Sequence, residues 1–131
     1  MKFECEHVGL AADDPARLRD WYVSVLDAET VMQLADDPPA FLVRLSGGLL
    51  VEIYQADFFL GETSDNKLRD WRHLALRVND LAGARTELES RGVTFPENVK
   101  PAGGGGRVSF FRDLEGNVFH LVERPQGFPI N

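Results

Sequence analysis

Apolar side chains recur along this chain with two different periods, and the same succession occurs twice. Residues 3–11 alternate between apolar and polar positions, as a strand does when one of its faces is buried. The next apolar positions have helical spacing: Leu18, Trp21, Tyr22, Val25 and Leu26. Asp13 or Asp14 suits the N-cap of this helix, and Pro15 suits its first position. The chain therefore begins with a predicted strand and a predicted amphipathic helix.

Three further strands complete the first half. The segment 30–34 reads as a short strand, and the Asp-Asp-Pro-Pro of residues 36–39 as a turn, since two prolines do not fit inside a ladder. Residues 41–45 and 49–55 are rich in β-branched, aromatic and leucine side chains, and Ser-Gly-Gly joins them as in a hairpin. The first half is thus predicted as β-α-β-β-β.

The second half repeats this order after a polar segment. The following ranges are predicted as strands: 71–78, 93–95, 108–111 and 118–123. Asn79 or Asp80 caps a helix that ends at Arg91-Gly92, and residues 96–106 form a long loop. We therefore expect a first module at 1–56, a linker at 57–70, a second module at 71–124 and a C-terminal tail at 125–131.

The three histidines of the chain follow this repeat. His7-Val8-Gly9-Leu10 aligns with His73-Leu74-Ala75-Leu76, and Leu50-Val51-Glu52-Ile53 aligns with Val118-Phe119-His120-Leu121. Each half thus carries one potential metal ligand on its first strand and one on its last strand. A duplicated unit that places its only histidines equivalently predicts one site with four ligands.

Three imidazoles and one carboxylate, from His7, His73, His120 and Glu52, suit Zn, Ni, Fe or Mn. The lack of thiolate ligands argues against a purely structural zinc site. Each histidine, taken alone, has a competing interpretation as a hydrogen-bonded core residue. Glu52 has three alternatives: a ligand, a base that leaves the metal during turnover, or a buried acid paired with an arginine. A divalent metal ion is therefore the expected cofactor.

Composition narrows the class of partner. The formal net charge of −7 and the pI near 4.9 argue against nucleic acid and anionic membranes, and no apolar run is long enough to span a bilayer. Cys5 is the only cysteine, and the N-terminus lacks the apolar core of a signal peptide, so a cytoplasmic location is expected. Arg107 and Arg112 flank an apolar run and are candidates to bind a small-molecule substrate.

Two other features have open interpretations. Tyr54 shares a strand face with Glu52 and is a candidate hydrogen-bond donor to substrate, with core packing as the alternative. The run Gly103–Gly106 lacks the Gly-Lys-Ser/Thr ending of a phosphate-binding loop. It is either a mobile lid over a pocket or a plain flexible connection.

In combination, three segments resemble the vicinal oxygen chelate superfamily, which includes glyoxalase I, extradiol dioxygenases, fosfomycin-modifying transferases and bleomycin-resistance proteins. They are the His7 strand with its Asp-Pro helix, the strand that begins at His73, and Phe111–Leu121, which is similar to the family's F-x-D-P-D-G-N-x-x-E-L signature. The resemblance implies an α+β fold, in which two βαβββ modules form an open, curved mixed-sheet barrel around a central cleft. It also implies a divalent ion, a substrate with two vicinal oxygens and, often, a homodimer.

His120 departs from the family pattern, because it stands where the family usually has glutamate. If His120 binds metal, Glu52 is the only carboxylate of the set that can abstract a proton. We therefore expect a metal-dependent lyase or isomerase in which Glu52 carries the proton. An Fe(II)-dependent dioxygenase and a non-catalytic protein that binds a drug or metabolite are the alternatives.

Overall fold

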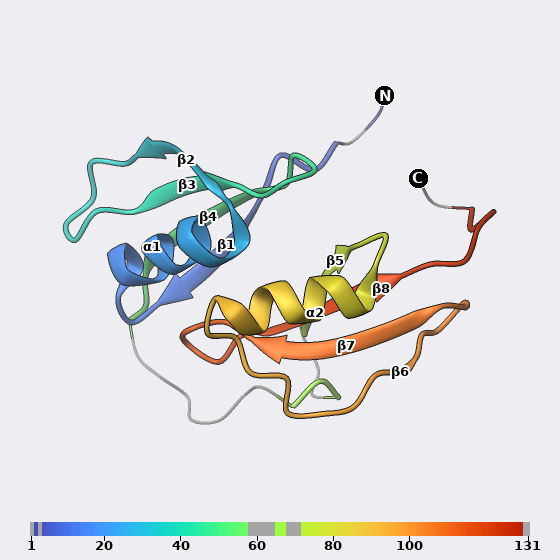
Figure 1. Cartoon of the computed structure of the whole chain (residues 1–131). Coiled ribbons are helices and arrows are strands. Elements are labelled where there is room, and N and C mark those ends of the chain that lie inside the picture. Colours follow the sequence, from blue (N-terminus) through green and yellow to red (C-terminus); the bar gives the residue numbers. More distant parts are fainter. Residues whose placement is uncertain (1, 3, 58–64, 68–71, 130–131) are drawn as a thin grey trace. The chain divides into compact units, whose positions relative to one another are not determined.

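The chain folds into two compact units, which span Met1–Gly61 and Glu62–Asn131. The computed structural model describes residues 2, 4–57, 65–67 and 72–129 (Figure 1). In these described ranges each unit contains one helix and one four-stranded sheet. The predicted α+β class and the two βαβββ modules are therefore confirmed. Most of the predicted linker 57–70 lies outside the described residues, as do Phe3, Trp71 and Ile130.

The first module contains β1 (His7–Ala12), α1 (Pro15–Leu26), β2 (Glu29–Gln33), β3 (Phe41–Arg44) and β4 (Leu50–Gln55). Its strand order is β1-β4-β3-β2, with β1 and β4 parallel and the other pairs antiparallel. Helix α1 lies along one face of this sheet (Figure 1) and buries Leu18, Tyr22 and Val25. The core forms there because alternate strand residues, such as Val51 and Ile53, are also buried.

The second module repeats the arrangement with β5 (His73–Arg77), α2 (Leu81–Ser90), β6 (Lys100–Pro101), β7 (Arg107–Arg112) and β8 (Val118–Glu123). Its strand order is β5-β8-β7-β6, and again the first and last strands, β5 and β8, pair in parallel. Leu81 and Leu88 of α2 are buried, as are Phe111, Phe119 and Leu121 of the sheet. In each module one sheet face carries the helix, and we call the opposite face the helix-free face.

Both helices begin at the predicted aspartates. Asp14 is the N-cap of α1 and accepts a hydrogen bond from the Arg17 amide, while Asp80 caps α2 and accepts one from Gly83. None of the helices in the described ranges is both long and apolar enough to cross a bilayer.

One predicted strand is wrong. Residues 93–95 form no strand, and the short edge strand is instead Lys100–Pro101, inside the segment predicted as a loop. The apolar character of residues 93–95 has another cause: Val93 is buried, and the Phe95 ring packs 5.5 Å from that of Phe111. These residues are apolar because they pack against the core after the helix ends, and the sequence pattern alone does not distinguish this packing from a strand.

The glycine run is the turn of the β6–β7 hairpin. The amide of Ala102 donates to the Gly106 carbonyl at 3.0 Å, and a Cβ at position 106 would lie 2.0 Å from the Glu123 carbonyl oxygen. Gly106 is required here because no side chain fits that space. Arg124 donates to the carbonyls of Gly103 and Gly105, and its guanidinium stacks 4.3 Å above the Phe128 ring of the tail.

Asp113 organises the β7–β8 turn within the signature segment. Its carboxylate is buried and accepts hydrogen bonds from the amides of Glu115 and Asn117 and from the Asn117 side chain, at 2.7–2.9 Å. Gly116, with φ of 91°, allows the turn to close. This turn positions the start of β8, and therefore the strand that carries His120.

Replacing Asp113 with alanine should lower the free energy of unfolding by about 2–4 kcal/mol, because three donors lose a charged acceptor in a partly buried turn. Asp113→Asn keeps one acceptor oxygen and should lose less. Chemical denaturation measures both. Asp20→Ala, at an exposed ion pair with Arg19, is the control and should change stability by less than about 1 kcal/mol. A loss at position 113 no larger than that of the control would contradict the role of the turn.

Candidate functional site

The parallel ladders set the four candidate ligands in equivalent positions. In the first module His7 pairs with Leu50, and Gly9 pairs with Glu52. In the second module His73 pairs with Val118, and Ala75 pairs with His120. The ligand on the last strand is thus offset by two residues from the partner of the histidine in both modules. Because an offset of two keeps side chains on one face, each pair lies on the helix-free face of its own sheet.

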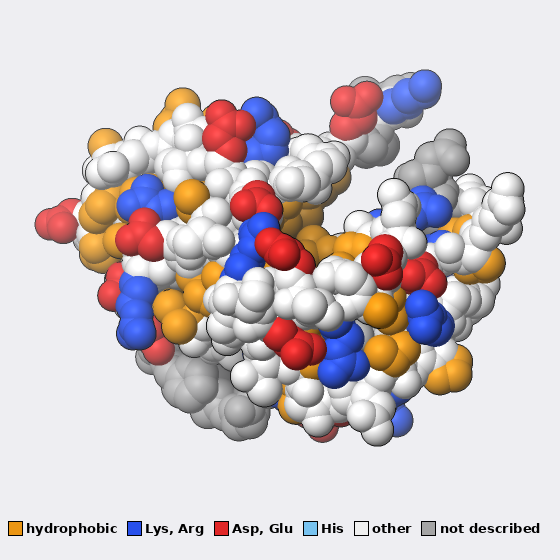
Figure 2. All heavy atoms as spheres, viewed as in Figure 1, with side chains coloured by type: hydrophobic (Ala, Val, Ile, Leu, Met, Phe, Trp, Pro, Cys, Tyr) orange, Lys and Arg blue, Asp and Glu red, His pale blue; other side chains and the backbone are white. Residues whose placement is uncertain are grey.

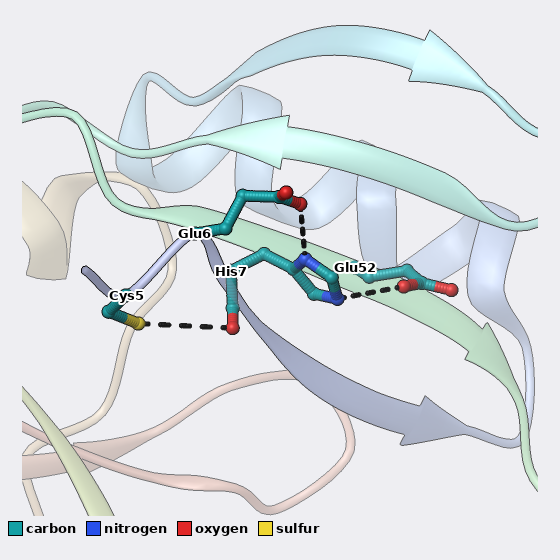
Figure 3. A network of polar contacts seen from close by, with 4 residues as sticks. All are labelled: Cys5, Glu6, His7 and Glu52. Carbon is teal, nitrogen blue, oxygen red and sulfur yellow. Dashed lines mark hydrogen bonds and ion pairs between the residues drawn. The ribbon is translucent and has the colours of Figure 1, made fainter. Parts of the chain in front are cut away.

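In the first module His7 lies between two carboxylates (Figure 3). Its Nδ1 is 2.8 Å from Glu6 Oε1, and its Nε2 is 3.2 Å from Glu52 Oε2. A neutral imidazole has one N–H, which can donate to only one of these acceptors. The remaining contact brings a ring lone pair against a carboxylate oxygen, and only a second proton or a metal ion between them makes it favourable. The geometry therefore fits either an imidazolium that bridges the two carboxylates or an ion held by His7 and Glu52.

The distance between these two atoms also fits a shared ion. Ligand atoms about 2.0–2.2 Å from a metal, at angles of 90–110°, are roughly 2.8–3.6 Å apart. A carboxylate on Nδ1 is a common means of fixing the orientation of a metal-binding histidine, and Glu6 provides one here. The carboxylate of Glu52 is partly exposed, with 28% of its side-chain surface accessible, so it remains open to a ligand.

Tyr54 follows Glu52 on the same face of β4, and its ring covers Gly9 of the neighbouring strand β1. A Cβ at Gly9 would lie 3.1 Å from Tyr54 Cε1, so the absence of a side chain there lets the phenol ring lie against β1. The ring is 38% exposed, which makes core packing of Tyr54 the weaker of its two sequence-based interpretations. Its hydroxyl lies over Gly9, on the face that carries His7 and Glu52, and can donate a hydrogen bond to a molecule bound on that face.

In the second module the rings of His73 and His120 lie 4.6 Å apart in an edge-on arrangement. Asn66 accepts a hydrogen bond from His73 Nδ1 at 2.7 Å, which places the proton of a neutral ring on Nδ1. The Nε2 of His73 then carries the lone pair that metal binding requires. This module repeats the first in orienting its first-strand histidine through an oxygen acceptor on Nδ1.

His120 is the buried member of the set. Its ring stacks on Phe110 at 4.9 Å, and its Nδ1 is buried without a hydrogen-bond partner among the described residues. Burial, followed by the charges of His73 and Arg124, lowers the pKa of His120 from 6.5 to about 4. The ring is therefore neutral at physiological pH, as a metal ligand must be, and a bound cation would satisfy its orphaned nitrogen.

Each module thus offers a pair of donors. In the part of the chain that the structure describes, no group of three or more His, Cys, Asp or Glu side chains is gathered as a metal site. Catalytic sites of this type use three or four protein ligands, so one pair alone is incomplete. The donor chemistry of both pairs nevertheless suits a divalent ion of the Zn, Ni, Fe or Mn type.

The two candidate arginines lie in different surroundings. Arg107 donates to Glu123 at 3.0 Å, and that carboxylate also accepts the Leu81 amide at the start of α2. The Leu81 amide and then Arg107 lower the pKa of Glu123 below its usual value. Arg112 instead shares the helix-free face with His120 and lines a cavity of about 300 Å³ within the second module.

The sequence alone did not identify three supporting residues. Glu6 precedes the first histidine, Asn66 lies in the predicted linker, and Phe110 was assigned only to a strand. For Phe110 the sequence did contain a signal: a hairpin between the last two predicted strands places Phe110 directly opposite His120. The roles of Glu6 and Asn66 depend on loop geometry, which no periodic pattern encodes.

Comparison with protein families gives a match over residues 5–121, to the model of the Glyoxalase/Bleomycin resistance protein/Dioxygenase superfamily. Among curated protein sequences none matches the chain.

Several solved structures have the same fold. A glyoxalase family protein from Enterococcus faecalis is 23% identical, with a TM-score of 0.78 and coverage of 92% of this chain and 97% of that one. A glyoxylase/bleomycin resistance protein/dioxygenase domain from Frankia sp. EAN1pec is 21% identical, with a TM-score of 0.75 and coverage of 97% and 96%. The fosfomycin resistance protein FosX from Listeria monocytogenes, complexed with Mn(II) and sulfate, is 19% identical, with a TM-score of 0.71 and coverage of 96% and 94%.

The depressed pKa of His120 predicts how stability changes with pH in metal-free protein. Between pH 6.5 and about 4 the unfolded chain takes up a proton at residue 120 that the folded chain refuses. The contribution of His120 to stability is therefore full above pH 6.5 and declines as the pH falls toward 4. Denaturation of wild type and His120→Gln at several pH values isolates this difference. A wild-type-minus-variant difference that is constant from pH 7 to 4 would contradict it, as would an NMR titration midpoint near 6.5.

Proposed function

Because the chain belongs to the Glyoxalase/Bleomycin resistance protein/Dioxygenase superfamily, we propose that it is a divalent-metal-dependent lyase or isomerase acting on a small molecule with two vicinal oxygens. The observation that carries the proposal is the repeated register, which puts His7 beside Glu52 and His73 beside His120. In both modules the donor on the last strand has the same offset from the histidine on the first strand, and these two pairs include all three histidines of the chain.

In this proposal the two pairs bind one ion, as three imidazoles and one carboxylate. The modules that share the ion belong either to one chain or to two chains of a homodimer, as is common for paired-module proteins of this superfamily. The nitrogen and oxygen donors fit Zn, Ni, Fe or Mn, and Mn(II) is present in the FosX complex. We place the protein in the cytoplasm, in line with its single exposed cysteine.

When bound, such an ion polarises a substrate carbonyl and acidifies the neighbouring C–H. Glu52 then takes and returns the proton, because it is the only carboxylate in the set of four. Its partial exposure lets the carboxylate reach a substrate, and its place 3.2 Å from His7 Nε2 keeps it beside the ion that His7 would bind. Tyr54 donates a hydrogen bond to substrate oxygen from the same face. Arg112 binds the far end of the substrate, and Arg107 contributes only if its contact with Glu123 opens.

Metal binding is the first test. Chelator-treated protein titrated with Zn²⁺, Ni²⁺ or Mn²⁺ in a calorimeter should bind one ion per pair of modules. His7→Ala and His73→Ala should each weaken binding by about 10–100-fold or more, since each removes one ligand. Glu29→Gln changes an exposed carboxylate on β2 of the first module and is the matched control. Unchanged affinity in the histidine variants would refute the shared site. Binding of a small organic ligand without any metal would favour the non-catalytic alternative.

The proton step has its own test. Metal-loaded protein in D₂O should exchange the C–H beside the carbonyl of hydroxyacetone faster than free metal does, as followed by NMR. Glu52→Gln should retain the metal and lose this exchange by about 10²–10⁴-fold, the usual contribution of a positioned base. Full exchange in Glu52→Gln would remove Glu52 from its role. Oxygen consumption by iron-loaded protein with a catechol, without exchange, would select the dioxygenase alternative.

A further inference from the structure

The second module contains a cavity of about 300 Å³ whose lining includes Phe110 and Asn66, two residues that contact its histidines. This volume lies at the lower end of the range for small-molecule sites, about 300–1,000 Å³. Phe110 and Val118 provide apolar wall, and Asn66, Lys67, Lys100 and Arg112 provide polar groups. The cavity therefore combines an apolar surface with several cationic side chains.

Two lining residues connect the cavity to the candidate ligands. Phe110 stacks on His120, and Asn66 accepts the hydrogen bond from His73 Nδ1. A molecule in the cavity consequently lies against side chains that contact both imidazoles. Phe110 and Asn66 therefore lie between the cavity and the two histidines.

The charges of the cavity are unevenly paired. Both lining acids have partners, since Glu97 pairs with Lys100 and Asp65 accepts the backbone amide of Lys67. The side chains of Lys67 and Arg112 have no ion pair among the described residues. A planar guanidinium with open donors favours an oxyanion, which it can bind through two parallel hydrogen bonds.

The distribution of charge over the chain strengthens this preference. Residues 1–61 contain 4 basic and 11 acidic side chains, whereas residues 62–131 contain 10 of each. The whole excess of negative charge thus belongs to the first module, and the second is neutral overall. Figure 2 shows basic and acidic side chains intermixed on the face that it displays. A small anion is therefore attracted to the cavity by local rather than global charge.

We propose that this cavity binds the oxyanion of a small organic acid with an apolar or aromatic body, and that Arg112 and Lys67 are its specificity-determining residues. This inference rests on the proposed function in one respect, namely that the bound acid is the substrate. The anion is held by the two cations, the apolar body lies against Phe110 and Val118, and the remaining oxygens point toward His73 and His120. A carboxylate and a phosphonate share this chemistry.

The test uses the chelator-treated full chain, so that binding is measured without metal. Benzoate and phenylphosphonate are titrated and followed by amide chemical shifts in NMR. Both should bind, with the largest shifts at Lys67, Phe110 and Val118. Neutral benzamide should bind at least about tenfold more weakly, because it forms no charge-assisted bond with Arg112. Inorganic phosphate, which lacks an apolar body, should also bind more weakly than phenylphosphonate.

Variants make the assignment specific. Arg112→Gln and Lys67→Gln should each weaken benzoate binding by about tenfold, while their binding of benzamide stays unchanged. Arg17→Gln removes the same charge from the exposed face of α1 and should bind benzoate as the wild type does. Equal affinity for benzoate and benzamide, or an unchanged affinity in Arg112→Gln, would overturn the proposal.

This outcome is separable from that of the proposed function. If metal-free protein binds the anion and Arg112→Gln weakens that binding, the cavity proposal is supported even when no metal binds to the histidines. Conversely, metal binding with no response to benzoate or phenylphosphonate overturns the cavity and leaves the metal site in place.

Discussion

Parallel pairing of the first and last strands of each module is the constraint on which the site depends. Strands β1 and β4, like β5 and β8, are far apart in sequence, and each pair brings a histidine-bearing strand beside the strand with the second ligand. Since side chains alternate along a strand, a slip of one residue would turn Glu52 or His120 toward the helix. The apolar residues on the helix side prevent this slip, because Val51, Ile53, Phe119 and Leu121 would all lose their burial together. The hydrophobic core therefore fixes the position of the polar ligands.

Sequence periodicity was sufficient for most of the fold. The two helices, their aspartate caps and the duplicated order of strands all leave strong local signals, and the alignment of the halves anticipated that the two modules carry their candidate ligands at equivalent positions. It failed at residues 93–95, whose apolar pattern resembled that of a strand although they have no hydrogen-bonded partner strand. It also failed at Lys100–Pro101, a strand that can contain a proline because it lies at the edge of the sheet. In the site, the ligand pairs could be named in advance, but Glu6, Asn66 and the cavity beside Phe110 could not. They depend on how loops return to the sheet, which a one-dimensional pattern does not contain.

The two modules keep the same backbone arrangement but have diverged in chemistry. The first places an exposed histidine beside a carboxylate and carries the negative charge of the chain. The second places a histidine beside a buried, neutral one and lines a cavity with cations. Duplication of a folded unit allows this division, because the core of each module is maintained by its own helix and strands. Histidine at position 120 is compatible with this fold because its ring stacks on Phe110 and needs no counter-charge while it is neutral.

Arg124 links three parts of the second module through one side chain. It donates hydrogen bonds to the carbonyls of Gly103 and Gly105, and its guanidinium stacks on Phe128. Its positive charge also contributes to the lowered pKa of His120. One positive charge is therefore shared by the glycine turn, the tail and the imidazole. Loss of that charge would free the turn and the tail together and would remove one cause of the lowered pKa of His120.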